Sequence, residues 1–250
     1  ISASDSTIYL YDDVDAAIDL SLNNNTWAAD WVELAAGQDV ILADEKTLTG
    51  EGTLVVVANR DVTLGGDVAA SVDVPGDLVL VAGADEDDDG SMHAFGTLET
   101  LLTDIELGGG NIDIYASDTT IILEDDVDAA ADLSLNNNTV VSDGVTLSAG
   151  QNVIVADEKT LHGEGVLTVR ANENTTLGGP TDAVGNLNVY ADFDSIDGGD
   201  LWAKSTLTSQ TASVYVSSSE DTTYLDDDVT AALDIVLDNS TYASGDLLAG

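Results

Sequence analysis

The sequence predicts an all-β protein that folds as a parallel β-solenoid, in which the chain winds through stacked coils. A block at 36–66, AGQDVILADEKTLTGEGTLVVVANRDVTLGG, returns at 149–179 as AGQNVIVADEKTLHGEGVLTVRANENTTLGG. Short runs of alternating apolar and polar residues recur along the chain, and Gly, Asn and Asp separate them. No stretch keeps a 3.6-residue spacing for several turns, so helices are not expected. A repeated frame of short strands is typical of a solenoid.

The repeat also predicts how the chain is organised. The offset of 113 residues between the two blocks carries SLNNNT at 21–26 onto 134–139, and a shorter third copy covers 221–250. We therefore expect a single solenoid over 1–250, with repeat units at about 5–117, 118–220 and 221–250, the last of them partial. Gly250 falls where the earlier copies continue, which suggests a segment of a longer chain or polymer.

Strands are expected wherever apolar residues alternate with polar ones. Apolar residues occupy the even positions of 14–22, and the same alternation returns at 127–135 and 229–237, so one face of each strand should point inward. Strand starts at Val40, Val62 and Leu78 suggest coils of roughly 20 residues. About a dozen coils would form an elongated rod near 60 Å long. Further strands are expected at 40–42, 54–57, 62–64, 78–81, 105–107 and 112–114.

Turn chemistry predicts the corners of the coils. The Asn triplets at 23–25 and 136–138 suit corners, where Asn tolerates left-handed backbone and its amide can bond to a neighbouring turn. A ladder of amides is the structural interpretation, and a ligand role is the alternative. The segment 85–110 differs from its shorter counterpart at 197–205, and such variable loops are where a repeat protein usually makes specific contacts.

Composition narrows the classes of partner. The formal charge is −43, from 48 acidic residues against five Lys and Arg, and such a surface repels phosphate backbones, so nucleic acid is not expected to bind. No apolar run reaches the length of a membrane span. The chain has no Cys, which excludes disulfides and thiolate metal sites and is compatible with secretion.

Two stretches resemble a known family. The run GNIDIYASDTTIILEDDVDAAADLSLNNNT from Gly110, together with the block at 36–66, resembles the DV-x-L, A-G and N-I-x-I phrases of large bacterial filamentous-haemagglutinin-type exoproteins. The likeness covers essentially the whole chain. It implies a right-handed parallel β-helix that is exported, displayed at the cell surface and used as an adhesin or scaffold. The chain departs from the family in its extreme acidity and in lacking a match to the N-terminal secretion domain, and no functional residue is carried over.

Acidic clusters are the strongest chemical signal. Asp13 and Asp15 flank the inward-facing Val14, so both carboxylates should lie on the outer face of a strand, and the second copy repeats the pair as Asp126 and Asp128. Oxygen ligands of this kind suit Ca²⁺. The alternative is a solvated acidic face, because the spacing matches neither an EF-hand nor the calcium-binding nonapeptide. A denser cluster in the variable segment supplies three further calcium candidates, Asp85, Asp87 and Asp89.

The sequence favours a structural role over catalysis. A single active site should be unique, yet the acidic pairs are copied with the frame, and His93 and His162 are isolated in the sequence. We expect an extracellular or cell-surface protein that forms a rod or filament and associates end to end or continues in the same chain. No cofactor is certain, and calcium is the one candidate. It could also carry a glycan or another cell-surface ligand. The alternative is a β-helix that binds or cleaves polysaccharide, as a hydrolase or lyase would.

Overall fold

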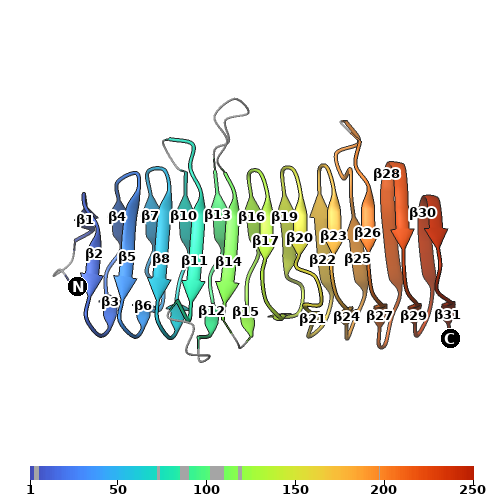
Figure 1. The fold of residues 1–250 in the computed structure, drawn as a ribbon, viewed down its shortest axis with the longest axis horizontal. Helices are drawn as coiled ribbons and strands as arrows, with labels where there is room; N and C mark the ends of the chain where they lie inside the picture. The colour runs from blue at the N-terminus through green and yellow to red at the C-terminus, as the bar shows by residue number, and fades with distance from the viewer. Residues whose placement is uncertain (3–5, 72–73, 85–89, 102–109, 118–119, 197) are drawn as a thin grey trace. The chain divides into compact units, whose positions relative to one another are not determined.

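The computed structural model describes residues 1–2, 6–71, 74–84, 90–101, 110–117, 120–196 and 198–250 (Figure 1). All regular structure in these residues is β, and it forms a parallel β-solenoid of about ten turns, which confirms the predicted fold class. The chain divides into two compact units, 1–131 and 132–250. The described residues contain no helix long and apolar enough to cross a membrane.

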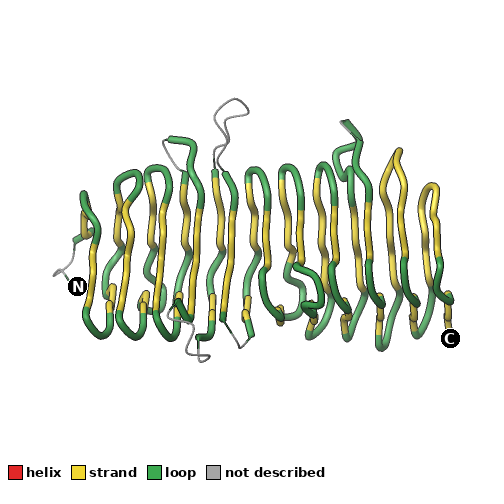
Figure 2. Tube along the Cα trace, viewed as in Figure 1, coloured by secondary structure: helices red, strands yellow, loops and turns green. Residues whose placement is uncertain are grey.

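In the first unit each coil adds one strand to each of three parallel rows, and short loops separate the strands (Figure 2). The first row contains β1 (Ile8–Leu10), β4 (Thr26–Ala28), β7 (Leu48–Gly50), β10 (Val68–Ala70), β13 (Leu98–Thr100) and β16 (Val127–Ala129). The second row contains β2 (Val14–Ala16), β5 (Val32–Ala36), β8 (Leu54–Ala58), β11 (Leu78–Ala82) and β14 (Ile112–Ala116). The third row contains β3 (Leu20–Leu22), β6 (Val40–Leu42), β9 (Val62–Leu64), β12 (Met92–Ala94) and β15 (Ile121–Leu123).

The second unit has the same three-row plan. One row contains β17 (Leu133–Leu135), β20 (Val153–Val155), β23 (Thr175–Leu177) and β26 (Leu201–Ala203). Another contains β18 (Thr139–Val141), β21 (Leu161–Gly163), β24 (Thr181–Ala183), β27 (Leu207–Ser209), β29 (Val229–Ala231) and β31 (Leu247–Ala249). The third contains β19 (Thr146–Ala149), β22 (Leu167–Ala171) and β25 (Leu187–Tyr190). The long strands β28 (Val214–Leu225) and β30 (Ile235–Ala243) bend and join two of these rows.

An aliphatic core runs through each unit because alternate residues of every row point inward. Leu34, Val56 and Leu80 stack in successive coils of the first unit and are fully buried, as are Val169 and Val189 in the second. Their neighbours along each strand face outward. A shift of one residue would expose a whole row, so the alternation fixes the register of every coil.

The structure divides the strand expected at 14–22 into β2 and β3, which belong to different rows. The inward alternation continues through the turn between the corresponding strands β16 and β17, where Ala131 is 4% exposed. The matching residue between β2 and β3 is Ile18, which is 61% exposed, so alternation in the sequence hides a corner whether or not the corner residue is buried. The strands expected at 40–42 and 62–64 have the predicted bounds, and those at 54–57, 78–81 and 112–114 end one or two residues later. The strand expected at 105–107 lies outside the described residues.

Candidate functional site

Asp and Asn side chains at the corners join each coil to the next. Asp61 Oδ1 accepts a hydrogen bond from the N–H of Ser91 at 3.0 Å, and Asp77 Oδ1 accepts one from the N–H of Asn111 at 3.0 Å. These carboxylates satisfy backbone donors at the point where the chain turns into a new strand. The same contact joins Asp13 to Glu33, Asn25 to Thr47, Asp30 to Thr53, Asp67 to Thr97, Asn138 to Thr160, Asp143 to Val166, Asn186 to Ser213 and Asp228 to Asp246.

One corner of the second unit carries a ladder of amides. Asn152 Nδ2 donates to Asp132 Oδ1 at 2.8 Å, and Asn174 Nδ2 donates to Asn152 Oδ1 at 2.8 Å. The ladder continues as Asn174 Oδ1 accepts from the N–H of Asp200, whose own Oδ1 accepts from the N–H of Thr222. In the Asn triplets, the last residue of each, Asn25 or Asn138, bonds to the next coil through its side chain. The amide-to-amide ladder lies elsewhere, at residues that were not singled out from the sequence.

The four described calcium candidates lie on the outer surface, as expected, but they do not converge. Asp13 precedes β2 and accepts the N–H of Glu33, while Asp15 faces outward in the middle of that strand. Asp126 and Asp128 are exposed at the equivalent places around β16. Within the described residues, no three His, Asp or Glu side chains are placed so that they could hold a metal ion. The remaining candidates, Asp85, Asp87 and Asp89, lie outside those residues, and calcium binding stays a prediction.

Like charges meet across the first row of the first unit. Glu99 in β13 lies in register with Asp128 in β16, and partial burial raises the pKa of the Glu99 carboxyl. The neighbouring carboxylates Asp128 and Asp67 raise this pKa further. The neighbouring carboxylates therefore oppose ionisation of Glu99. A bound cation would offset this repulsion.

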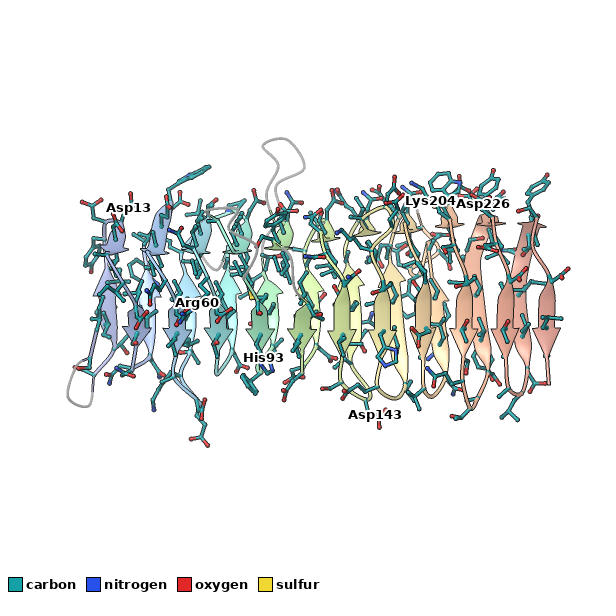
Figure 3. All side chains as sticks on the ribbon, turned by 60° about the horizontal axis from the view of Figure 1, so that its bottom comes forward. Asp13, Arg60, His93, Asp143, Lys204 and Asp226 are labelled. Carbon is teal, nitrogen blue, oxygen red and sulfur yellow. The ribbon has the colours of Figure 1, made fainter. Side chains whose placement is uncertain are left out.

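Both histidines pair with a carboxylate on the following coil. His93 Nε2 lies 2.8 Å from Glu124 Oε1, and His162 Nδ1 lies 2.7 Å from Asp182 Oδ2. Figure 3 shows His93 projecting outward from its strand. Each imidazole thus bridges two coils, although the sequence alone showed no partner for it.

Aromatic rings line the outside of the coils and do not fill the core. Trp202, Tyr224 and Tyr242 stack in register on three successive coils, with centroids 5.6 and 5.8 Å apart and ring planes within 13° of each other. In the first unit Trp27 contacts Tyr9 with centroids 6.0 Å apart. These rings stabilise neighbouring strands as cross-strand pairs do in other sheets.

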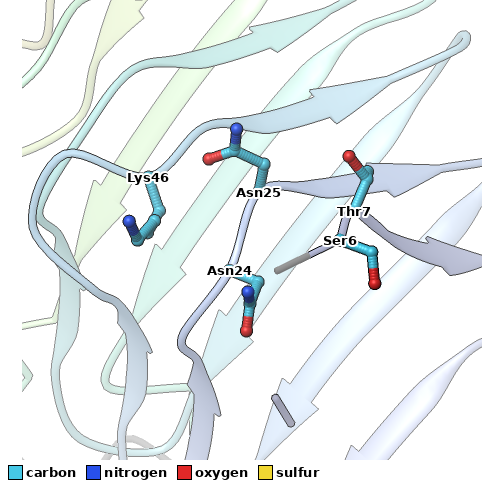
Figure 4. Close-up of a pocket in the computed structure, with 5 residues that line it drawn as sticks. All are labelled: Ser6, Thr7, Asn24, Asn25 and Lys46. Atoms are coloured by element: carbon cyan, nitrogen blue, oxygen red, sulfur yellow. The ribbon is translucent and has the colours of Figure 1, made fainter. Parts of the chain in front are cut away.

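A groove follows one corner of the first unit. A pocket of about 290 Å³ is lined by Ser6, Thr7, Asn24, Asn25 and Lys46 (Figure 4). Lys46 also lines a second pocket of about 400 Å³, together with residues that include Asp67, Phe95 and Asp125. The two pockets share Lys46, so a polar groove crosses several coils.

The corresponding corner of the second unit is different. β12 pairs with β9 as β26 pairs with β23, so Lys204 occupies the place of Phe95. Lys204 Nζ lies 2.7 Å from Asp157 Oδ1 and spans the corner with an ion pair. Pro180 stands where the first unit has Asp67. The first unit thus has an exposed ring and an extra carboxylate where the second has an ion pair and a proline.

Comparison with known proteins adds no family. No family model matches the chain, no curated protein is similar to it in sequence, and no solved structure matches it. The site is therefore defined by its own geometry.

Sequence reasoning missed the two features that organise the corners. Several of the acceptor residues could have been found, because Asp or Asn directly precedes an aliphatic strand residue at Asp13, Asp61, Asp67, Asp77, Asn186 and Asp228, as in the DV-x-L phrase. The exchange of Phe95 for Lys204 could also have been found by aligning MHAFG at 92–96 with LWAKS at 201–205. The groove itself depends on the stacking of coils and leaves no local pattern.

Proposed function

We propose that this chain is a structural segment of an extracellular surface protein of the filamentous-haemagglutinin type that its sequence resembles. It would act as part of a rod or filament, either as a cell-surface scaffold or as the stalk of an adhesin. The observation that carries this proposal is the corner hydrogen bond that repeats from coil to coil along the frame.

The last coil exposes side chains whose counterparts in the preceding coil are buried. Leu247 in β31 lies in register with Val229, yet Leu247 is 45% exposed and Val229 is fully buried. Ile235 in β30 lies in register with the buried Val214 and is only half-buried. An edge strand also presents free hydrogen-bonding groups to any further strand. A second copy of this chain that docks on this edge would bury these side chains.

The recurring carboxylates are also explained by a structural role. Asp residues that recur with the frame accept backbone N–H groups from the following coil, as Asp13 and Asp228 do. A side chain that is needed at every coil is expected to recur in every repeat, whereas a catalytic pair need occur only once.

The proposal is tested by the assembly state of the intact chain. We expect sedimentation velocity and electron microscopy to show end-to-end assemblies that lengthen with protein concentration. Calcium should favour them over chelator if the acidic faces approach one another. Leu247→Lys should shift the chain towards monomers, because it places a charge on the open edge.

The matched control is Ile154→Lys, which adds the same charge to an exposed residue on the outer face of β20. Assembly of this variant should equal that of the unmodified chain. A chain that stays monomeric at every concentration, or a Leu247→Lys variant that assembles normally, would contradict the proposal.

A further inference from the structure

The corner groove of the first unit has a floor without side chains. A Cβ atom on Gly66 would collide with the carbonyl oxygen of Lys46, and one on Gly96 would collide with the backbone of Gly66. Successive coils approach so closely here that only glycine fits. The groove is therefore a fixed consequence of how the coils stack, and its chemistry is set by the side chains along its rim.

The rim combines a ring with polar and charged groups. Phe95 is 42% exposed and stacks on His93, with ring centroids 3.9 Å apart, so the phenyl ring is held in place while remaining open to solvent. Lys46 forms no ion pair within the described part of the chain. Asp67 and Asp125 supply carboxylates on the following coils. Ligand sites typically combine apolar surface with a few placed polar groups in this way.

The second unit shows that the frame does not require this arrangement. There Lys204 replaces the ring and forms an ion pair with Asp157, and Pro180 replaces Asp67. Gly65 and Gly66 are kept as Gly178 and Gly179, with the same close approach to the coil before, while Ser205 stands in the place of Gly96. The paired glycines are thus structural, while Gly96, the ring and the extra carboxylate are particular to the first unit.

We propose that this groove binds a neutral glycan chain. The apolar face of a sugar ring would stack on Phe95, and its hydroxyl groups would pair with Lys46, Asp67 and the Asn side chains farther along the groove. A linear chain fits because the groove runs from coil to coil, at about 4.8 Å per coil. An acidic glycan is disfavoured, since the rim carries more carboxylates than ammonium groups and the whole chain has a charge of −43. The proposal adds a ligand to the surface role above and does not depend on filament formation.

Titration calorimetry of the full chain with neutral hexasaccharides, namely cello-, laminari-, xylo- and mannohexaose, tests this site. We expect at least one of them to bind with one site per chain. Phe95→Lys places the residue of the second unit in the first, so the fold should tolerate it. It should weaken binding by roughly tenfold or more, the loss expected for a central contact. Lys46→Met should weaken binding as well.

Trp31→Lys is the matched control, because it removes another exposed ring from the same unit and adds the same charge. It should leave the affinity unchanged, and equal losses in both variants would mean that any exposed ring suffices and would overturn the assignment. Absence of binding by all four hexasaccharides, or unchanged binding by Phe95→Lys, would also overturn it. Sedimentation velocity on the same samples separates this outcome from failure of end-to-end assembly.

Discussion

At the scale of single residues, many acidic side chains of this chain serve as hydrogen-bond acceptors for its backbone. The Asp residues that precede strands are acceptors for N–H groups one coil ahead, with N···O distances such as 2.8 Å for Asp30 and 2.7 Å for Asp143. A carboxylate makes a stronger acceptor than an amide, and here it also adds a charge. The corners can therefore be acidic without any ligand.

Asp77→Ala should lower the free energy of unfolding by about 1–3 kcal/mol, because the N–H of Asn111 loses this side-chain acceptor. Asp77→Asn keeps an oxygen in the same position and should cost much less, while removing the same charge. Urea denaturation of the three proteins measures the difference. Equal losses in both variants would assign the effect to charge and not to the hydrogen bond.

At the scale of strands, outward-facing residues are more specific to each coil than the inward ones. The inward positions are mostly Val, Leu, Ile or Ala, with Thr or Ser at several, while the outward positions of the last coils bring Trp202, Tyr224 and Tyr242 into one stack. A central ring with a partner on each side couples three strands. Such a stack stiffens the coils nearest the open edge.

Tyr224→Thr keeps a good strand former and removes the central ring, so it should destabilise the second unit by about 1–2 kcal/mol. Tyr215→Thr is the control, because Tyr215 lies in the same strand without a ring contact in the described part of the chain. Thermal unfolding followed by circular dichroism compares them. A larger loss for the control would show that the stack contributes little.

The strands could be predicted because apolar and polar residues alternate within each of them. The assignment of strands to rows could not be predicted, because it depends on pairing between coils. Val40–Leu42 and Val62–Leu64 have the bounds that alternation predicts, and the repeat predicts their coil length. The break between β2 and β3 was missed because apolar and polar residues go on alternating in the sequence through Ile18, although Ile18 is 61% exposed. Contacts such as His162 to Asp182 join residues 20 positions apart, so they depend on a register that only the stacked coils define.

At the scale of the whole molecule, charge opposes the compact state. With 48 acidic residues and five basic ones, carboxylates such as Glu99 and Asp128 face each other on adjacent strands. Repulsion of this kind lowers stability until counter-ions screen it. Burial of the aliphatic core must therefore outweigh the repulsion between surface carboxylates in each unit.

Raising NaCl from about 10 mM to about 300 mM should raise the Tm, since the Debye length falls from about 30 Å to below about 8 Å. Each kcal/mol gained corresponds to about 2–4 °C for a chain of this size. Scanning calorimetry at constant pH measures the shift. A Tm that is flat or falls over this range would show that repulsion between the carboxylates is negligible in the folded state.

The corner contacts also have a direction that bears on how such a chain could grow. The corner acceptor belongs to the earlier coil and the backbone donor to the later one, from Asp13 and Glu33 to Asp228 and Asp246. Because successive coils use the same contact, a duplication or deletion of whole coils brings together an acceptor and a donor that already match. Gene segments encoding complete coils could thus be exchanged without a new interface.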